Sequence, residues 1–169
     1  MHPGSRRLLL MLLLLPPLAL MVACGGNPAD TRWTSAQQGS RNKPAVAKEA
    51  LPGSAFNKFF PKAAAPWDLT YKQEKQGTAI ASLKKDGKEV ATLTVFDTVS
   101  EPDVAEKYKE ATQALAGCPL VAIGAKGTAV LVANRFQVQV RSTDNSFTED
   151  DRKDWIKRFD LDGLAKLND

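Results

Sequence analysis

The chain has 169 residues, 43% hydrophobic and 25% charged, which is the mixture expected of a globular protein with one ordinary domain. The formal net charge is +4, but two arginines lie in an N-terminal leader, and the other 21 basic and 19 acidic residues give only +2. This near balance argues against a nucleic-acid-binding protein.

The first residues predict a secretory signal peptide over residues 1–23. Two arginines precede an apolar stretch from Leu8 to Leu20, and small residues follow before Cys24. A membrane-spanning helix needs about 20 apolar residues, and the proline pair at 16 and 17 would break this one. The pattern therefore favours export over a permanent membrane span.

The cleavage region, Met21-Val22-Ala23-Cys24, resembles the lipobox of bacterial lipoproteins, with methionine in place of the commoner leucine. The resemblance implies that the Cys24 thiol receives a diacylglyceryl group, that the signal is cut before it, and that the new amine is acylated, for example with palmitate. Several acyl chains together hold a protein stably on a membrane. The alternative is an ordinary signal peptide in which the cysteine is incidental.

Such an anchor places the protein in the cell envelope, on the extracytoplasmic side of a membrane. Gly25 does not resemble the aspartate of the inner-membrane retention signal. The resemblance therefore permits the outer membrane, facing the periplasm, where the cell has one, and otherwise the outer face of the plasma membrane. The membrane lipid reached through Cys24 is the expected partner, together with a protein of the envelope.

Residues 24–53 predict a flexible tether, because they are rich in Gly, Pro, Ser, Asn and Gln and show no helical or strand period. A chain of this length holds a domain about 30 Å from the bilayer surface. Trp33 is the one large apolar residue of the tether, and we interpret it as exposed by chance or, alternatively, as a docking anchor.

The chemistry of the mature protein is limited because the only histidine, His2, lies in the predicted signal peptide. Catalytic triads that contain histidine and histidine-ligated metals are excluded. Cys118 is the only cysteine besides Cys24, so no intrachain disulfide is expected. We interpret Cys118 as a small buried apolar residue, and the alternative is a reactive thiol that would need a nearby base or positive charge.

A single α+β domain is predicted over residues 54–169. It opens with a short helix that Ser54 would cap and whose three phenylalanines, Phe56, Phe59 and Phe60, should be buried. A first strand follows from Trp67. Two alternating runs around Asp86-Gly87 then predict a hairpin with a two-residue type I′ turn.

The predicted register of that hairpin is set by the turn. It places Ile80 opposite Leu93, Ser82 opposite Ala91, and Leu83 opposite Val90.

The second half of the domain is likewise predicted to contain a helix followed by three strands. Residues 100–117 predict a helix, with Ser100 and Asp103 as a capping box and Gly117 as its stop. Its apolar stripe comprises Val104, Tyr108, Ala111 and Leu115. Three apolar runs follow as strands, separated by turns at 124–127 and 133–134.

The last strand predicted, over residues 135–142, has one apolar and one polar face. A final helix begins at a second capping box, Thr148 and Asp151, and buries Trp155, Ile156 and Phe159. Leu161, Leu164 and Leu167 continue it as a short turn across the core.

The predicted fold is therefore an antiparallel sheet of about five to six strands, in the order βββαβββα, with helices packed on it. This order loosely resembles the PsbP-like and Mog1-like α/β/α sandwiches, which are non-enzymatic assembly or binding domains. By analogy the resemblance implies a binding role.

Four further patterns could suggest a ligand-binding site, but each has a simpler structural explanation. Residues 124–128 lack the spacing of a phosphate loop and read as a hairpin turn. The acids Asp144, Glu149, Asp150 and Asp151 do not have EF-hand spacing and suit the first turn of a helix. The stretch 160–163 reads as a helix break, and Lys84, Lys85 and Lys88 as a solvated hairpin tip rather than an anion site.

The sequence thus predicts no catalytic, cofactor-binding or metal-binding residues, and Cys24 is the only modified site. Our leading hypothesis is a membrane-anchored envelope lipoprotein that acts as a non-enzymatic binding or assembly module. The alternatives are a small-ligand carrier, with an apolar pocket between sheet and helix, and a thiol-dependent enzyme that uses Cys118.

Overall fold

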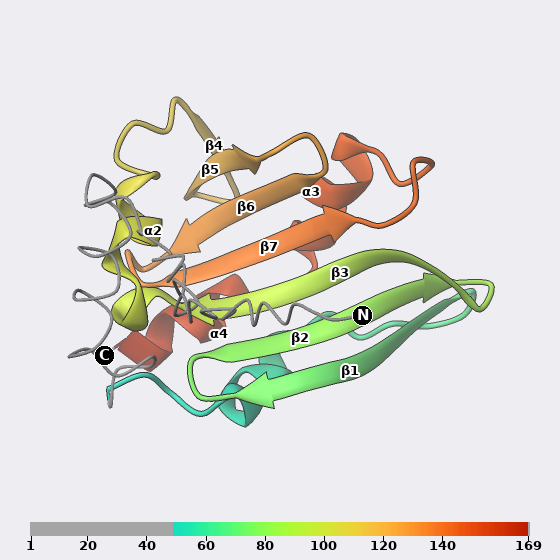
Figure 1. Cartoon of the computed structure of the whole chain (residues 1–169), viewed down its shortest axis with the longest axis horizontal. Coiled ribbons are helices and arrows are strands. Elements are labelled where there is room, and N and C mark those ends of the chain that lie inside the picture. The colour runs from blue at the N-terminus through green and yellow to red at the C-terminus, as the bar shows by residue number, and fades with distance from the viewer. Residues whose placement is uncertain (1–48, 169) are drawn as a thin grey trace, which may run out of the picture. The chain divides into compact units, whose positions relative to one another are not determined.

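The computed structural model describes residues 49–168 and contains one seven-stranded, fully antiparallel sheet (Figure 1). The strands are β1 Trp67–Lys75, β2 Thr78–Lys85, β3 Lys88–Asp97, β4 Gln113–Leu115, β5 Cys118–Ile123, β6 Gly127–Val132 and β7 Phe136–Ser142. The α-helices are α2 Pro102–Glu106, α3 Glu149–Lys157 and α4 Leu161–Ala165. The 3₁₀ helices are η1 Gly53–Phe59, η2 Thr98–Ser100 and η3 Lys166–Asn168.

The sheet is built from two meanders that meet in its middle. Its spatial order is β1-β2-β3-β7-β6-β5-β4, so β3, the last strand of the first meander, pairs with β7, the last strand of the second. Consecutive strands joined by short turns pair antiparallel, as expected. The predicted α+β class with an antiparallel sheet is confirmed, but the predicted number of five to six strands is too low, because β4 was missed.

One face of the sheet carries the main hydrophobic core. Figure 1 shows η1, α3 and α4 behind the strands, and side chains of all three are buried there. Phe56, Phe59 and Phe60 are at most 5% exposed, so their predicted burial is confirmed. Ser54 does not cap η1, because the N-cap residue is Pro52 and no side chain bonds the first turn. The interior on this face is filled by aromatic and branched side chains.

The opposite face of the sheet is covered only in part by the described residues. The turn after α2 places Tyr108 against Ala129 and Leu131, where its hydroxyl donates to Gln137 Oε1 at 2.9 Å. The rest of this face carries threonine, glutamine and isoleucine side chains in register across β2, β3 and β7. The predicted polar side of the last strand lies here.

The hairpin of β2 and β3 confirms the turn that its sequence predicts. Asp86 and Gly87 both have positive φ, 51° and 80°, as a type I′ turn requires. The predicted register is wrong beyond the first two pairs, because Leu83 pairs with Ala91 and Val90 is left over as a bulge. The Val90 carbonyl instead accepts hydrogen bonds from Thr143 and Asp144, and this contact with the loop after β7 stabilises the bulge.

The bulge shifts every later pair by one residue. Ile80 lies opposite Thr94, and Ser82 lies opposite Thr92, in place of the predicted Leu93 and Ala91.

The predicted helix over residues 100–117 is also wrong in most of its length. Only Pro102–Glu106 is α-helical, Glu101 is the N-cap residue, and no side chain caps the helix. The predicted apolar stripe is divided between the two faces of the sheet: Tyr108 packs on the partly covered face, whereas Leu115 packs against the main core. The chain between these two residues therefore passes around the outer edge of the sheet.

The final helix forms as predicted. The Thr148 hydroxyl accepts from the Asp151 amide while the Asp151 carboxylate accepts from the Thr148 amide, which completes the capping box of α3. Trp155, Ile156 and Phe159 are at most 5% exposed. The break before α4 is also confirmed, since the Asp160 carboxylate accepts from the Gly163 amide as N-cap.

The packed chain begins before Ser54, the residue at which we predicted the domain to start. Ala50 is only 5% exposed, and the Leu51 amide donates to Asp97 Oδ2 at 3.1 Å. The predicted signal peptide, the lipidation site Cys24 and the tether up to residue 48, with Trp33, lie outside the described residues. Among residues 49–168, no helix has the length and apolar character needed to cross a bilayer.

Candidate binding groove at the outer edge of β5

The outer edge of the sheet is only partly closed by its last strand. A two-residue turn, Ala116-Gly117, with φ of 50° and 77°, joins β4 to β5 and sets Leu115 opposite Cys118. The last pair of this short ladder is Gln113 with Leu120. Three residues of β5, Val121–Ile123, continue beyond the end of β4.

The backbone of Ala122 lies on this open edge. Along an antiparallel strand the N–H and C=O groups of successive residues point to opposite neighbours. Leu120 faces its partner Gln113, so Ala122, two residues on, turns its N–H and C=O to the same outer side, away from β6. No hydrogen bond from any residue between 49 and 168 reaches Ala122 from that side, and its side chain is exposed.

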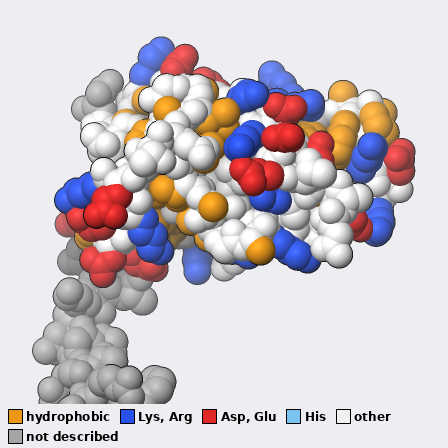
Figure 2. All heavy atoms as spheres, turned by 90° about the horizontal axis from the view of Figure 1, so that it is seen from above, with side chains coloured by type: hydrophobic (Ala, Val, Ile, Leu, Met, Phe, Trp, Pro, Cys, Tyr) orange, Lys and Arg blue, Asp and Glu red, His pale blue; other side chains and the backbone are white. Residues whose placement is uncertain are grey.

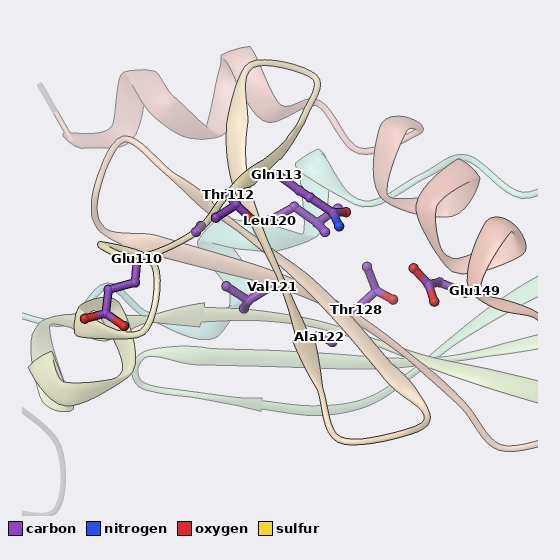
Figure 3. A pocket seen from close by; sticks show the side chains of 9 residues that line it. Glu110, Thr112, Gln113, Leu120, Val121, Ala122, Thr128 and Glu149 are labelled. Atoms are coloured by element: carbon purple, nitrogen blue, oxygen red, sulfur yellow. The ribbon is translucent and has the colours of Figure 1, made fainter.

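A groove of about 280 Å³ runs along this edge (Figure 3). It forms because the chain between Tyr108 and β4 does not pair with β5 but turns around its edge. The lining residues are Glu110, Ala111, Thr112, Gln113, Leu120, Val121, Ala122, Thr128 and Glu149. In Figure 3, Gln113 and Leu120 point toward the same space as Thr128 and Glu149.

The groove reaches both faces of β5. Thr128 lies opposite Ala122 in the sheet and accepts a hydrogen bond from Arg152 of α3, so this pair belongs to the helix-covered face. Val121 projects to the other face, where it packs near Tyr108. A groove that wraps around a strand edge is shaped for a chain lying beside the strand, since side chains of an added strand alternate between the same two faces.

The groove is lined by two acidic side chains, and the cations Lys153 and Arg152 lie near one of them. The two acids are Glu149 and Glu110, and none of the described lining residues is a lysine or an arginine. The hydrogen bond from Lys153 Nζ to Glu149 Oε1, at 2.7 Å, and its positive charge lower the pKa of Glu149, so this carboxylate is ionised at neutral pH. Elsewhere on the surface, basic and acidic side chains are interspersed in the view of Figure 2.

A buried arginine supports the wall of the groove. Arg152 is 6% exposed, and it donates from Nε to Thr128 Oγ1 and from Nη1 to Ser142 Oγ, both at 2.9 Å. The Ser142 hydroxyl in turn donates to the Phe147 carbonyl at 2.6 Å. These bonds fix the start of α3 against β6 and β7, and hence the position of Glu149. The sequence offered no sign of this role, because Arg152 occupies an ordinary charged position of an amphipathic helix.

A second arginine joins the two meanders at the opposite end of the sheet. Asp97 is fully buried at the end of β3, and Arg135, just before β7, donates to it from Nε at 3.0 Å and from Nη2 at 2.8 Å. The backbone amides of Leu51 and Val99 also donate hydrogen bonds to this carboxylate. Burial acts to raise the pKa of Asp97, but these hydrogen bonds and the charge of Arg135 outweigh it and hold the pKa below its usual value.

Cys118 is not among the residues that line the groove, and it has no activating neighbour in the described chain. The side chain is half-buried against the main core, at the start of β5. Burial, and to a lesser extent the negative charge of Asp162, raise the pKa of the Cys118 thiol. The thiol is therefore protonated at neutral pH, which is the opposite of the activation that a nucleophilic cysteine needs.

The remaining predicted patterns take structural roles. Gly124 lies in the β5–β6 turn, with a φ of 61°. Of the four acids, Asp144 pairs with Lys88, Glu149 pairs with Lys153, and Asp151 serves the capping box. Lys85 lies over the ring of Trp67 at 5.3 Å. Among residues 49–168, no three acidic, cysteine or histidine side chains gather closely enough to hold a metal ion.

The sequence does not predict the open edge of β5, because the helical spacing of its apolar residues predicts a helix over residues 113–115. The signal that would have found it is Ala116-Gly117 between two short apolar runs, a weak hairpin pattern.

Comparison with known proteins adds no further assignment. No protein-family model matches the chain, and no curated protein and no solved structure matches it. The resemblances to bacterial lipoproteins and to PsbP-like or Mog1-like domains stay predictions.

Proposed function

We propose that this protein is a membrane-anchored envelope lipoprotein that acts as a non-enzymatic binding module, and that its binding surface is the open edge of β5. The observation that carries the proposal is the groove along this edge. There a sheet edge has been left unpaired where the chain turns away from it, and polar and apolar side chains line both of its faces. Edges of this kind bind extended segments of other proteins.

In this proposal, Cys24 carries the acyl chains that would hold the domain at the membrane. The described chain enters the domain at the Asp97–Arg135 pair, because Arg135 Nη2 also donates to the Glu49 carbonyl at 3.1 Å. The groove lies at the outer edge of the sheet, three strands away from β3, which carries Asp97. The point at which the described chain enters the domain is therefore separate from the groove.

The two alternatives have less support. A thiol-dependent enzyme would need an ionised Cys118, whereas the pKa of this thiol is raised. A carrier with an apolar pocket between sheet and helices would need an interior space, whereas the side chains of Phe56, Ile156 and Leu164 in that layer are fully buried and packed.

The anchor is tested with a Cys24→Ser variant in intact cells. We expect it to lose labelling by radioactive palmitate and to leave the membrane fraction, because the thiol that carries the lipid is gone. A Cys118→Ser variant is the matched control and should keep both properties. Unchanged palmitate labelling of Cys24→Ser would contradict the anchor.

The binding surface is tested with a photo-crosslinking amino acid at Ala122 of the full chain in intact cells, followed by identification of the adduct. We expect a protein adduct from Ala122 and none from the same amino acid at Lys157, at the far end of α3. Adducts from Lys157 alone, or from neither position, would show that the β5 edge is not the binding surface.

A further inference from the structure

We infer that the groove takes an extended segment of a partner protein that adds to β5 as an antiparallel strand, with a lysine or arginine opposite Ala122 and apolar residues on either side of it. This inference rests on the proposed function and names the chemistry of the partner.

The backbone of Ala122 fixes which partner residue is bound. Its N–H and C=O both point outward, so a residue directly opposite on an antiparallel strand would exchange two hydrogen bonds with it. The side chain of that opposite residue projects to the same face as the Ala122 side chain. This is the helix-covered face, where Thr128 and Glu149 lie.

The side chains of the groove favour a different residue type on each face. On the helix-covered face, Gln113, Thr128 and Glu149 offer an amide, a hydroxyl and a carboxylate. On the other face, Val121 and Ile123 are partly buried apolar residues. A strand that alternates apolar, basic and apolar residues therefore matches the groove, with the basic residue beside Glu149.

Glu149 has room for a second cation. Lys153 contacts Oε1 of its carboxylate, and the Glu149 side chain is 60% exposed. A carboxylate offers about four lone-pair sites, so Oε2 stays available for a lysine or arginine of the partner. Glu110 also lines the groove, but its carboxylate points away from Gln113 and Glu149 in Figure 3, so Glu149 is the acid assigned to the partner's cation.

Charge also decides against a second copy of this chain as the occupant. Pairing two β5 edges around a two-fold axis would bring together two grooves with the same acidic lining, and β5 contains no lysine or arginine that could face Glu149. Like charges opposite one another destabilise a strand pair. We therefore assign the groove to a partner with the opposite charge.

The test is a titration of the isotope-labelled full-length protein in detergent micelles with a probe peptide, Ac-Thr-Val-Lys-Val-NH₂. The dissociation constant is taken from the amide shifts of Ala122 and Gly124. We expect the peptide with glutamate in place of lysine to bind about tenfold more weakly, since attraction to Glu149 is replaced by repulsion.

Backbone pairing is tested with two N-methylated peptides. Methylation of the lysine nitrogen removes the N–H that would bond Ala122, and we expect a loss of about tenfold or more in affinity. Methylation of the valine that follows alters an N–H on the outer side of the added strand, and should have a much smaller effect. Equal losses from the two peptides would overturn the strand-addition geometry.

Charge reversal in the protein completes the design. Glu149→Lys should weaken the lysine peptide about tenfold and strengthen the glutamate peptide, whereas Asp154→Lys, which breaks the comparable pair with Lys157, should change neither. If no peptide binds, if the lysine and glutamate peptides bind equally, or if the chain self-associates through this edge, the inference fails. An adduct at Ala122 in cells would then still support the proposed function, and its absence would remove both.

Discussion

The two exposed edges of the sheet, along β1 and along the part of β5 that extends beyond β4, differ in length, charge and cover. β1 is nine residues long, and most of its side chains are exposed and polar or charged. The register shifts between Tyr71 and Gln73, so Lys72 forms a bulge, and its ammonium group pairs with Glu89 at 2.6 Å. Charged side chains and bulges are the devices that keep an exposed edge from pairing with other chains.

The edge at β5 carries neither device. It is short, its exposed residue is an alanine, and the chain that should have covered it turns away to form a groove. This contrast between a protected edge and an open one beside a groove supports the proposal that the second binds a partner.

The largest effect is expected in the middle of the sheet, where the pairing of β3 with β7 joins the two meanders. Asp97→Ala removes the buried carboxylate that joins β3 to Arg135 and to the Leu51 amide, and leaves these groups unpaired. We expect a loss of about 3–5 kcal/mol in the free energy of unfolding, measured by urea denaturation. Asp68→Ala, on the exposed β1 edge, should change it by less than about 0.5 kcal/mol.

Equal stabilities of these two variants would show that the Asp97–Arg135 pair does not hold the meanders together. Two separate unfolding transitions in the wild type would show that the two edges belong to independent units.

The same pair predicts how stability depends on pH. The folded state lowers the pKa of Asp97, so the unfolded state binds more protons in acid, and the stabilisation is complete only above the unfolded pKa of about 3.9. It is lost as the pH falls through the lower folded-state pKa. Denaturation at pH values from neutral to strongly acid should therefore show a steeper loss for the wild type than for Asp97→Asn.

Other carboxylates with lowered pKa, such as Glu89 and Glu149, leave a residual slope in both proteins. Identical slopes in the wild type and in Asp97→Asn would contradict the role assigned to Asp97.

The smallest effect on stability, but a clear one on association, is expected at the β1 edge. Lys72→Val removes the charge from the bulge and leaves an apolar side chain on the exposed strand, so we expect self-association at high protein concentration, measured by light scattering. The free energy of unfolding should change by less than about 0.5 kcal/mol. Lys109→Val removes an exposed charge away from the edge and is the matched control.

Some elements of this chain can be predicted from the sequence and others cannot, and the difference has a physical cause. The Asp86-Gly87 turn and the capping box of Thr148 and Asp151 were predicted correctly, because local backbone geometry and short-range hydrogen bonds determine both. The register of the hairpin was not, because the Val90 bulge is stabilised by Thr143 and Asp144, which are distant in sequence.

The prediction of a helix over residues 100–117 was wrong because contacts distant in sequence again decide the structure of this segment. Its apolar residues have helical spacing, but Tyr108 bonds Gln137 on one face of the sheet while Leu115 packs in the core on the other. These tertiary contacts outweigh the helical propensity of the segment. The groove arises from the same turn of the chain around the sheet edge, so no prediction that lacked β4 could find it.

The most direct test of the account compares the two edges in the cell. A photo-crosslinking amino acid is placed at Ala122 on β5 or at Thr70 on β1 of the full chain, and the adduct yields are compared. We predict a protein adduct at Ala122 that is lost in Glu149→Lys and retained in Asp154→Lys, with no adduct at Thr70. Equal yields from both edges, or an Ala122 adduct that is unchanged by Glu149→Lys, would contradict it.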